Sequence, residues 1–198
     1  MSEQYRMTTR AQRGQRTLRA AAIFAGALFV LSVPKARAQD AVVETPNGTF
    51  VIHLLPDVAP QHVKHFVETV KKGGYDGTTF HRIIVGGIIQ GGDPLSKDPR
   101  NAKLYGTGGL DLLKAEFSDR PFARGVVAAA RKPGKNDSGG SQFFVCLREQ
   151  PSLKGQYTIF GEVTEGLDVV DKISMTPVDG DKPQVRVEMR VKLREAAP

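Results

Sequence analysis

The chain has 198 residues, with 28 Lys and Arg against 21 Asp and Glu, a formal charge of +7. Seven basic residues and one acid lie within residues 1–38, so 21 basic and 20 acidic residues remain in 39–198. This near-balance does not indicate the basic face that nucleic-acid binding requires, so no nucleic-acid partner is expected. The lone cysteine, Cys146, cannot form an internal disulfide and is expected to be a small buried hydrophobe.

Residues 1–38 have the organisation of a cleavable signal peptide. Five arginines precede an uncharged apolar run over 20–33, and the Ala-Arg-Ala sequence ending at Ala38 has the small-x-small pattern of a cleavage site. The apolar run is shorter than the about 20 residues that a membrane-spanning helix needs. We therefore expect cleavage after Ala38, a periplasmic or secreted protein, and no stable membrane association after cleavage. An uncleaved membrane anchor is the alternative for this segment.

Six segments of the remaining chain predict β-strands, because they place β-branched and aromatic residues between Gly or Pro residues. These segments are 49–55, 78–84, 125–130, 142–147, 158–163 and 184–193. The last segment alternates apolar and charged residues, which predicts a strand with one buried and one solvated face. Its expected buried residues are Val185, Val187, Met189, Val191 and Leu193.

Apolar residues at helical spacing predict a helix over 60–72, which begins at Pro60 and ends before Gly73-Gly74. A shorter helix is expected within 166–174. Many strands with two short helices indicate a mainly β fold, a closed antiparallel β-barrel capped by those helices. The segments 93–122 and 132–140 are expected to be loops, and long loops inside a domain are commonly functional.

Three short motifs carry the chemistry of the chain: FHRII at 80–84, QGGD at 90–93 and GSQFF at 140–144. Strand alternation predicts Phe80, Arg82 and Ile84 on one face of the first motif. An arginine among apolar neighbours either reaches solvent, pairs with an acid or serves a binding site.

The two motif glutamines, Gln90 and Gln142, lie next to glycines in apolar β-sequence. A buried amide there needs hydrogen-bond partners. The glutamines either tie down loops, or bind a peptide backbone and hold Arg82 in place. Phe143 and Phe144 are adjacent in a strand and are expected to point to opposite faces.

Together these motifs resemble the two hallmark stretches of the cyclophilin-type peptidyl-prolyl isomerases, and the likeness extends over nearly all of 49–193. The resemblance implies an eight-stranded barrel domain over 41–195, isomerisation of the bond before proline, and proline-containing polypeptides as partners. It implies neither a metal nor a cofactor. Nothing in the sequence favours an oligomer, so a monomer is expected.

The resemblance also assigns roles to individual residues. Arg82 is the hydrogen-bond donor to the proline nitrogen, Gln90 orients it, and Gln142 contacts the substrate backbone. Further substrate-binding residues are Phe144, Ile88 and Leu153 around the proline ring, Ala130 and Arg131 through their backbone groups, and also Phe80 and Tyr157.

Three positions depart from the family pattern. Gly87 stands where the family usually has a phenylalanine that forms a wall of the proline pocket. Ser152 stands where many members have a tryptophan that contacts cyclosporin-type inhibitors, so weak cyclosporin binding is expected. Tyr157 replaces a pocket histidine, and its hydroxyl can still donate a hydrogen bond.

Other classes of function fit the sequence less well. The departures at Gly87 and Ser152 motivate one alternative, a non-catalytic chaperone module that binds proline peptides. A lipocalin-like carrier is disfavoured because the polar motif residues do not suit an apolar lumen. A weak metal site on the first helix, at His62, His65 and Glu68, is disfavoured against a solvated helix face.

Overall fold

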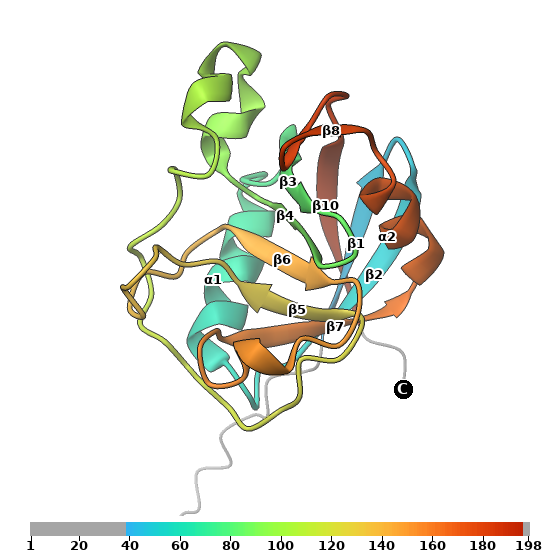
Figure 1. Ribbon diagram of the computed structural model, residues 1–198. Coiled ribbons are helices and arrows are strands. Elements are labelled where there is room, and N and C mark those ends of the chain that lie inside the picture. Colours follow the sequence, from blue (N-terminus) through green and yellow to red (C-terminus); the bar gives the residue numbers. More distant parts are fainter. Residues whose placement is uncertain (1–38, 196–198) are drawn as a thin grey trace, which may run out of the picture. The chain divides into compact units, whose positions relative to one another are not determined.

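The computed structural model describes residues 39–195, and these residues form a closed β-barrel with a helix on each of two opposite sides (Figure 1). The expected signal peptide, 1–38, lies outside the described residues. Eight strands close the barrel in the order β1-β10-β3-β4-β6-β5-β7-β2, and every neighbouring pair is antiparallel. The predicted fold class is therefore confirmed.

The bounds of the elements follow the sequence pattern at most positions. The barrel strands are β1 (Gln39–Thr45), β2 (Gly48–Leu54), β3 (Thr78–Ile84), β4 (Ile88–Gly91), β5 (Val126–Ala129), β6 (Phe143–Cys146), β7 (Ile159–Glu165) and β10 (Glu188–Glu195). A small hairpin is formed by β8 (Val178–Asp179) and β9 (Lys182–Pro183). The helices are α1 (Pro60–Lys71), α2 (Leu167–Ser174) and the 3₁₀ helices η1 (Pro94–Lys97), η2 (Pro99–Leu104) and η3 (Pro151–Leu153).

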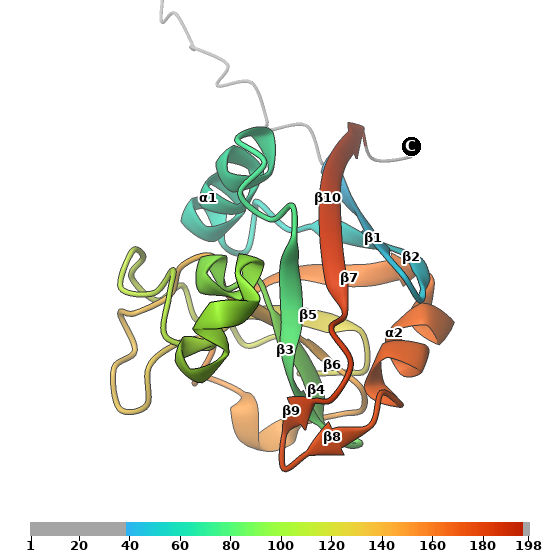
Figure 2. The same ribbon diagram turned by 90° about the horizontal axis from the view of Figure 1, so that it is seen from above.

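The barrel interior is filled by side chains. The interior cluster takes residues from all eight strands and from both α-helices, including Phe66 of α1 and Ile173 of α2, which are 2% and 0% exposed. Figure 2 shows α1 and α2 on opposite sides of the barrel. A packed interior leaves no lumen of the kind that a lipocalin-like carrier requires.

A second apolar cluster lies outside the barrel, against the other face of β5 and β6. Its buried members are Phe122, Val126, Ala128, Ala130, Phe144, Cys146 and Ile159. Phe144 belongs to this cluster and Phe143 to the interior, so the prediction that they point to opposite faces is confirmed. Cys146 is 0% exposed, and burial raises the pKa of its thiol to about 12, as expected of a buried hydrophobe.

The predicted alternation of β3 is wrong at one position. The pairing with β4 shifts register between Phe80 and Arg82, which is a β-bulge at His81. A bulge inserts one extra residue and changes the face to which the next residues of the strand point. Phe80 and Ile83 therefore both enter the interior, at 1% and 0% exposure, while Arg82 lies on the outer face.

Two further expectations need correction. The last strand begins at Glu188, not Gln184, so Val185 is 61% exposed and is not on the buried face. His62 of α1 is 4% exposed, and its Nδ1 lies 2.6 Å from Oε2 of Glu116, so this helix face is not simply solvated. In the described part of the chain, no cluster of His, Cys, Asp and Glu has an arrangement that could hold a metal ion.

Of the two predicted loops, the first contains short helices and the second is irregular. The segment 93–122 contains η1 and η2, whereas 132–140 holds no helix or regular strand. Asp93 begins η1 by accepting a hydrogen bond from the amide of Leu95, and its other carboxylate oxygen accepts from the amides of Gly106 and Gly108. Among residues 39–195, no helix has the length and hydropathy that crossing a membrane would require.

Candidate active site

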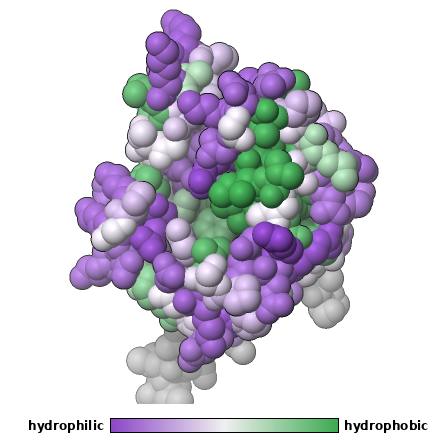
Figure 3. All heavy atoms as spheres, viewed as in Figure 1, coloured by the Kyte–Doolittle hydropathy of each residue, from purple (hydrophilic) through white to green (hydrophobic). Residues whose placement is uncertain are grey.

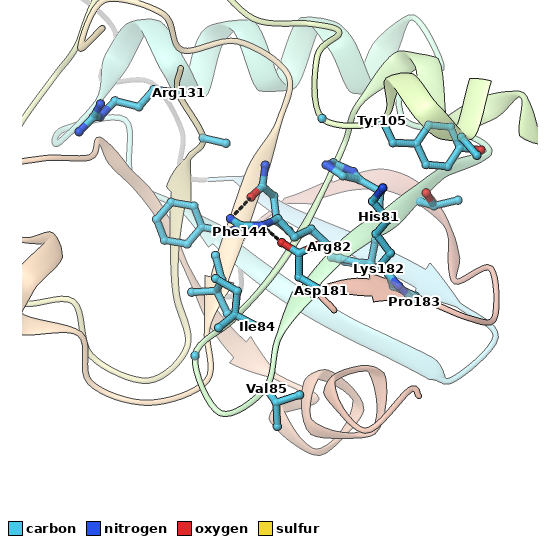
Figure 4. A pocket seen from close by; sticks show the side chains of 18 of the residues that line it. His81, Arg82, Ile84, Val85, Tyr105, Arg131, Phe144, Asp181, Lys182 and Pro183 are labelled. Atoms are coloured by element: carbon cyan, nitrogen blue, oxygen red, sulfur yellow. Dashed lines mark hydrogen bonds and ion pairs between the residues drawn. The ribbon is translucent and has the colours of Figure 1, made fainter. Parts of the chain in front are cut away.

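A pocket of about 1040 Å³ opens on the outer face of β3, β4 and β6. Its floor at one end is the second apolar cluster, reached through Phe144 and Ile88. Its other end lies between η2 and the β8–β9 hairpin with the residues just after β9, where Tyr105 and Pro183 contribute to the walls. Arg82 lies between the two ends (Figure 4).

Arg82 is held by acceptors on two sides. Its Nε donates to Oδ2 of Asp181 at 2.7 Å, and its Nη1 donates to Oε1 of Gln90 at 3.2 Å (Figure 4). Asp181 is fixed in turn, because its carbonyl oxygen accepts a 2.8 Å hydrogen bond from the amide of Ile83 in β3. The hairpin therefore positions the guanidinium from one side and β4 from the other.

The hydrogen-bonded chain continues from Gln90 into the protein. Nε2 of Gln90 donates to Oε1 of Gln142 at 3.0 Å, and Nε2 of Gln142 donates to the carbonyl of Gly108 at 2.7 Å. Gly108 is fixed in turn, because its amide donates to the carboxylate of Asp93. A side-chain network with each member bonded holds its terminal group in a defined orientation.

Part of the guanidinium is left available to a ligand. A guanidinium has five N–H groups, and within residues 39–195 only those on Nε and one on Nη1 have partners. The Arg82 side chain is 41% exposed and borders the pocket. The site thus presents fixed, charged N–H donors above an apolar floor.

The apolar end of the pocket is built around Phe144. The Phe144 ring is 3% exposed and meets the ring of Tyr157 edge-on, with centroids 5.3 Å apart at 89°. Cζ of Arg131 lies 4.6 Å from the centroid of the Tyr157 ring, a cation–π geometry. Ile88 and Leu153 are half-buried against the same cluster. Such a surface suits a small apolar ring.

The rim beside Gly87 is open and apolar. Ile84 and Val85 are 40% and 72% exposed, and Figure 3 shows apolar side chains gathered on the face where the pocket opens. A Cβ added at Gly87 would lie 3.0 Å from Cγ2 of Ile84 and 3.3 Å from its carbonyl oxygen. A Cβ at this position is therefore tight and requires a small movement of Ile84.

Burial and pairing set the charge state around Arg82. The hydrogen bond from Arg82 holds the pKa of the Asp181 carboxyl below its usual value, so Asp181 is ionised at neutral pH. Burial lowers the pKa of His81, which is 8% exposed, so its imidazole is neutral at pH 7. Neither ring nitrogen of His81 has a hydrogen-bond partner among the described residues.

The structure brings most of the sequence-predicted site residues together. Those that line the pocket are Arg82, Phe80, Ile88, Gln90, Ala130, Arg131, Phe144, Leu153 and Tyr157. Phe80 borders the pocket, but its ring packs in the barrel interior edge-on to Phe143, so it supports the site from below. Gln142 is 1% exposed and lies behind Gln90, which favours a positioning role over a direct substrate contact.

Sequence reasoning missed Asp181, the partner of Arg82. The two residues are 99 positions apart, and no motif links them. It also missed the pocket residues Arg148 and Lys182, and Phe122 beneath the apolar end. The only local signal was the Asp-Gly-Asp sequence at 179–181. It predicts a hairpin, but not that this hairpin packs beside Arg82.

This barrel, with a fixed arginine beside an apolar pocket, defines the class of protein. The model of the family "Cyclophilin type peptidyl-prolyl cis-trans isomerase/CLD" matches residues 41–193. The chain therefore belongs to the cyclophilin-type peptidyl-prolyl cis-trans isomerase family.

Individual relatives agree with this assignment. A Brucella suis protein named "Probable peptidyl-prolyl cis-trans isomerase" is 41% identical over 80% of this chain and 84% of its own length. A Helicobacter pylori peptidyl-prolyl cis-trans isomerase is 40% identical over 67% of this chain and 78% of its own. Among solved structures, a Cryptosporidium parvum cyclophilin-type isomerase is similar with a TM-score of 0.72 at 28% identity, covering 81% of this chain and 99% of that one.

Proposed function

We propose that this protein accelerates the cis/trans rotation of X–Pro peptide bonds in other polypeptides, with Arg82 as the catalytic residue. The observation that carries the proposal is the pairing of Arg82 with both Asp181 and Gln90, which fixes its free N–H groups above the Phe144 floor. The structure of the same Cryptosporidium parvum isomerase with the dipeptide Ala-Pro supports a proline-containing ligand for this fold.

The chemistry asked of Arg82 is modest and well defined. Rotation about an X–Pro bond faces a barrier of about 18–20 kcal/mol because the planar amide is stabilised by resonance. In the twisted transition state this resonance is lost, so the proline nitrogen becomes pyramidal and more basic. A donor aimed at that nitrogen binds the transition state more tightly than the planar ground state, which lowers the barrier. No proton transfer is required.

The other pocket residues supply binding and orientation. Phe144, Ile88 and Leu153 form the surface for the proline ring. Ala130 and Arg131 line the same wall, and their backbone groups would bind the residue before proline; the Ala130 amide already donates to the carbonyl of Gln142, so Ala130 would contribute its carbonyl oxygen. Gln142 acts through Gln90. A rigid donor matters because a hydrogen bond that must first be ordered loses part of its free energy to entropy.

An isomerisation assay tests the proposal. A proline-containing peptide starts from one known cis/trans ratio. The relaxation of this ratio to equilibrium is followed with and without the purified protein. We expect relaxation much faster than the uncatalysed tens to hundreds of seconds. Relaxation at the uncatalysed rate, with the protein folded and binding the peptide, would favour the second candidate.

The second candidate is a non-catalytic module that binds proline peptides as a chaperone. Gly87 and Ser152 favour it, because each is smaller than the aromatic residue that many family members have at that position. Ser152, which stands where many family members have tryptophan, also predicts weak binding of cyclosporin. Ser152 is exposed and next to the pocket residue Leu153, so Ser152→Trp is expected to raise cyclosporin affinity, measured for both proteins by isothermal titration calorimetry. Equal affinities of wild type and variant would contradict this role of position 152.

We further propose that the protein is exported and acts as a monomer on exported polypeptides. Support comes from the arginine-rich start, the apolar run at 20–33 and the cleavage pattern ending at Ala38. Mass spectrometry of the protein from the periplasm or culture medium should give a chain that begins at Gln39. A chain that begins at Met1 and sediments with membranes would support the uncleaved anchor instead.

A further inference from the structure

Positive charge is concentrated at the pocket. Of the 21 basic and 20 acidic residues in 39–198, five basic residues and one acid line the pocket, which leaves 16 basic and 19 acidic residues elsewhere. The five basic residues are Arg82, Arg131, Arg148, Lys182 and Arg186. The acid is Asp181, and its charge is balanced by Arg82. The pocket is therefore cationic on a domain that is otherwise slightly acidic.

Most of these cations already have partners within the protein. Arg186 binds Glu188, the Tyr105 hydroxyl and two backbone carbonyls. Arg131 donates to the carbonyls of Gln156 and Lys132 and stacks on Tyr157. These arginines have fixed positions, and their charges contribute a field without being free to move.

Arg148 and Lys182 differ from the other pocket cations. Both are exposed, and in the part of the chain that the structure describes neither side chain has an ion pair or hydrogen bond. Lys182 lies opposite Asp179 in the β8–β9 register, yet no ion pair forms between them, and its field acts on Asp181. Glu149 is next to Arg148 in sequence but does not line the pocket. Two unpaired cations in one pocket point to an anionic ligand.

We propose that the pocket selects polypeptides that carry acidic side chains on the residues flanking the proline. This proposal rests on the isomerase function proposed above and names the class of substrate. Arg148 and Lys182 would pair with the flanking Asp or Glu side chains, and Arg131 and Arg186 would strengthen the positive potential between them. A cleft lined by one sign of charge focuses that potential and raises the association rate of oppositely charged ligands.

The arrangement of the pocket fits an extended peptide with charges on both flanks. Figure 4 shows Arg131 on one side of Phe144, and Arg82 with Lys182 on the other. Arg148 lines the same pocket, two residues after the end of β6. A proline seated on Phe144 would thus have basic side chains in both directions along the chain. The salt bridges expected are solvent-exposed, so each should change affinity by roughly 1.4- to 5-fold.

The test uses four peptides with a central Ala-Pro and Glu, Gln or Lys at matched flanking positions: two Glu, two Gln, two Lys, and Glu on one side only. Isomerisation kcat/KM and binding by fluorescence anisotropy are measured at low and high salt. We expect kcat/KM for the two-Glu peptide to exceed that for the two-Gln peptide by roughly 3- to 10-fold at low salt, with the two-Lys peptide lowest. At high salt the differences should shrink, because screening weakens exposed pairs.

Matched variants identify the residues responsible. Arg148→Gln with Lys182→Gln should bring the Glu-to-Gln ratio of kcat/KM close to one. The control removes the same charge elsewhere, through Lys64→Gln with Lys114→Gln, two exposed lysines that do not line the pocket. The control should keep the full ratio. Loss of the ratio in the control as well would assign it to net charge and overturn the proposal.

Failure of this proposal can be distinguished from failure of the proposed function. Equal kcat/KM for the Glu, Gln and Lys peptides at low salt would overturn the acidic-substrate proposal and leave the isomerase function intact. No acceleration of any peptide would overturn the isomerase function, and anisotropy would then decide the substrate class. Equal dissociation constants for the Glu, Gln and Lys peptides would then overturn the acidic-substrate proposal as well.

Discussion

The two faces of the same four strands have opposite compositions. Strand register sets one residue from each of β3, β4, β6 and β5 side by side in a row across the sheet. One such row faces the interior and consists of Ile83, Ile89, Val145 and Val127. The next row faces outward and consists of Arg82, Gln90 and Phe144, which line the pocket, and Ala128, which is buried in the second apolar cluster. Neighbouring residues of the same strands thus lie on opposite faces: one row is entirely aliphatic, and the other contains the polar pair Arg82 and Gln90.

This difference separates stability from chemistry. The inner row is 0% exposed and contributes through burial and close packing, which need no specific partner. The outer face leaves N–H groups of Arg82 free and keeps the apolar Ile84, two residues along β3, at the surface, features that add little to stability. We therefore expect changes on the inner face to act on the free energy of unfolding and changes on the outer face to act on turnover.

The largest effect on stability is expected on the inner face. Phe143 is 0% exposed and packs edge-on against Phe66, Tyr75 and Phe80. Phe143→Ala should lower the free energy of unfolding by about 3–5 kcal/mol, measured by urea denaturation. Its neighbour provides the comparison: Phe144→Ala should cost less stability and raise KM for proline peptides. Equal losses of stability in both variants would mean that the two faces are not distinct.

The next effect tests the positioning of Arg82. Asp181→Ala removes the acceptor of the Arg82 Nε–H group, and we expect kcat/KM to fall about tenfold, or about 1.4 kcal/mol, mostly in kcat. Asp181→Glu should restore part of the loss. Because both side chains of the pair are nearly half exposed, the free energy of unfolding should change by less than about 1 kcal/mol.

Asp179 gives a matched control on the same hairpin. It is exposed, does not line the pocket and, among residues 39–195, forms no hydrogen bond or ion pair with Arg82, so Asp179→Ala should leave kcat/KM unchanged. If Asp179→Ala and Asp181→Ala were equally impaired, the effect would belong to the hairpin as a whole. The Asp181–Arg82 contact would then have no special role.

His81 occupies the bulge and lines the pocket, and it should make stability depend on pH. Burial lowers its pKa in the folded state below the usual 6.5. The unfolded chain then binds more protons as pH falls below 6.5, so stability is lost from pH 6.5 downward until the folded pKa is reached. The slope is at most about 1.4 kcal/mol per pH unit for this one group.

Urea denaturation between pH 7.5 and 5.5 checks this expectation. His81→Phe should flatten the curve but not abolish it, because burial also lowers the pKa of His65. A curve of unchanged slope in His81→Phe would show that His81 does not titrate as inferred.

The smallest effect concerns the open rim. Gly87→Phe would add an apolar wall to the pocket at the cost of a small movement of Ile84. Burying part of one aromatic side chain against proline should lower KM several-fold, within the roughly 1–3 kcal/mol available from such a contact. Gly87→Ala, which adds only the Cβ, should have little effect on KM. A raised KM in Gly87→Phe would mean that the open rim admits substrate and needs to stay open.

The sequence could predict the barrel because most of its strands have clear patterns. It could not predict the face of Arg82, because the bulge at His81 leaves no mark on the alternation of a seven-residue strand. The expected phase put Phe80 beside Arg82, and the ring lies in the interior instead. The strands β1 and β4 were also not predicted; β1 closes the barrel between β10 and β2, a role that is entirely long-range, and β4 has only four residues.

The site shows the same division. Residues within the motifs, such as Gln90 and Phe144, were predicted in the pocket and line it. Asp181 was not, because contact with Arg82 depends on where a hairpin 99 residues away folds back. The contact of Gln142 with substrate stays a prediction, and the structure adds that this side chain is 1% exposed and hydrogen-bonded to Gln90. The sequence alone therefore identified the types of residue in the site, but not which distant residues contact each other in the fold.

The most direct test of the account measures turnover and stability together in Arg82→Ala. Removing one transition-state donor commonly costs about 10²- to 10³-fold in rate. We therefore predict that kcat/KM for proline-peptide isomerisation falls by that order, while the free energy of unfolding in urea stays within about 1 kcal/mol of wild type. A variant that is as active as wild type, or that loses activity only because it unfolds, would contradict the account.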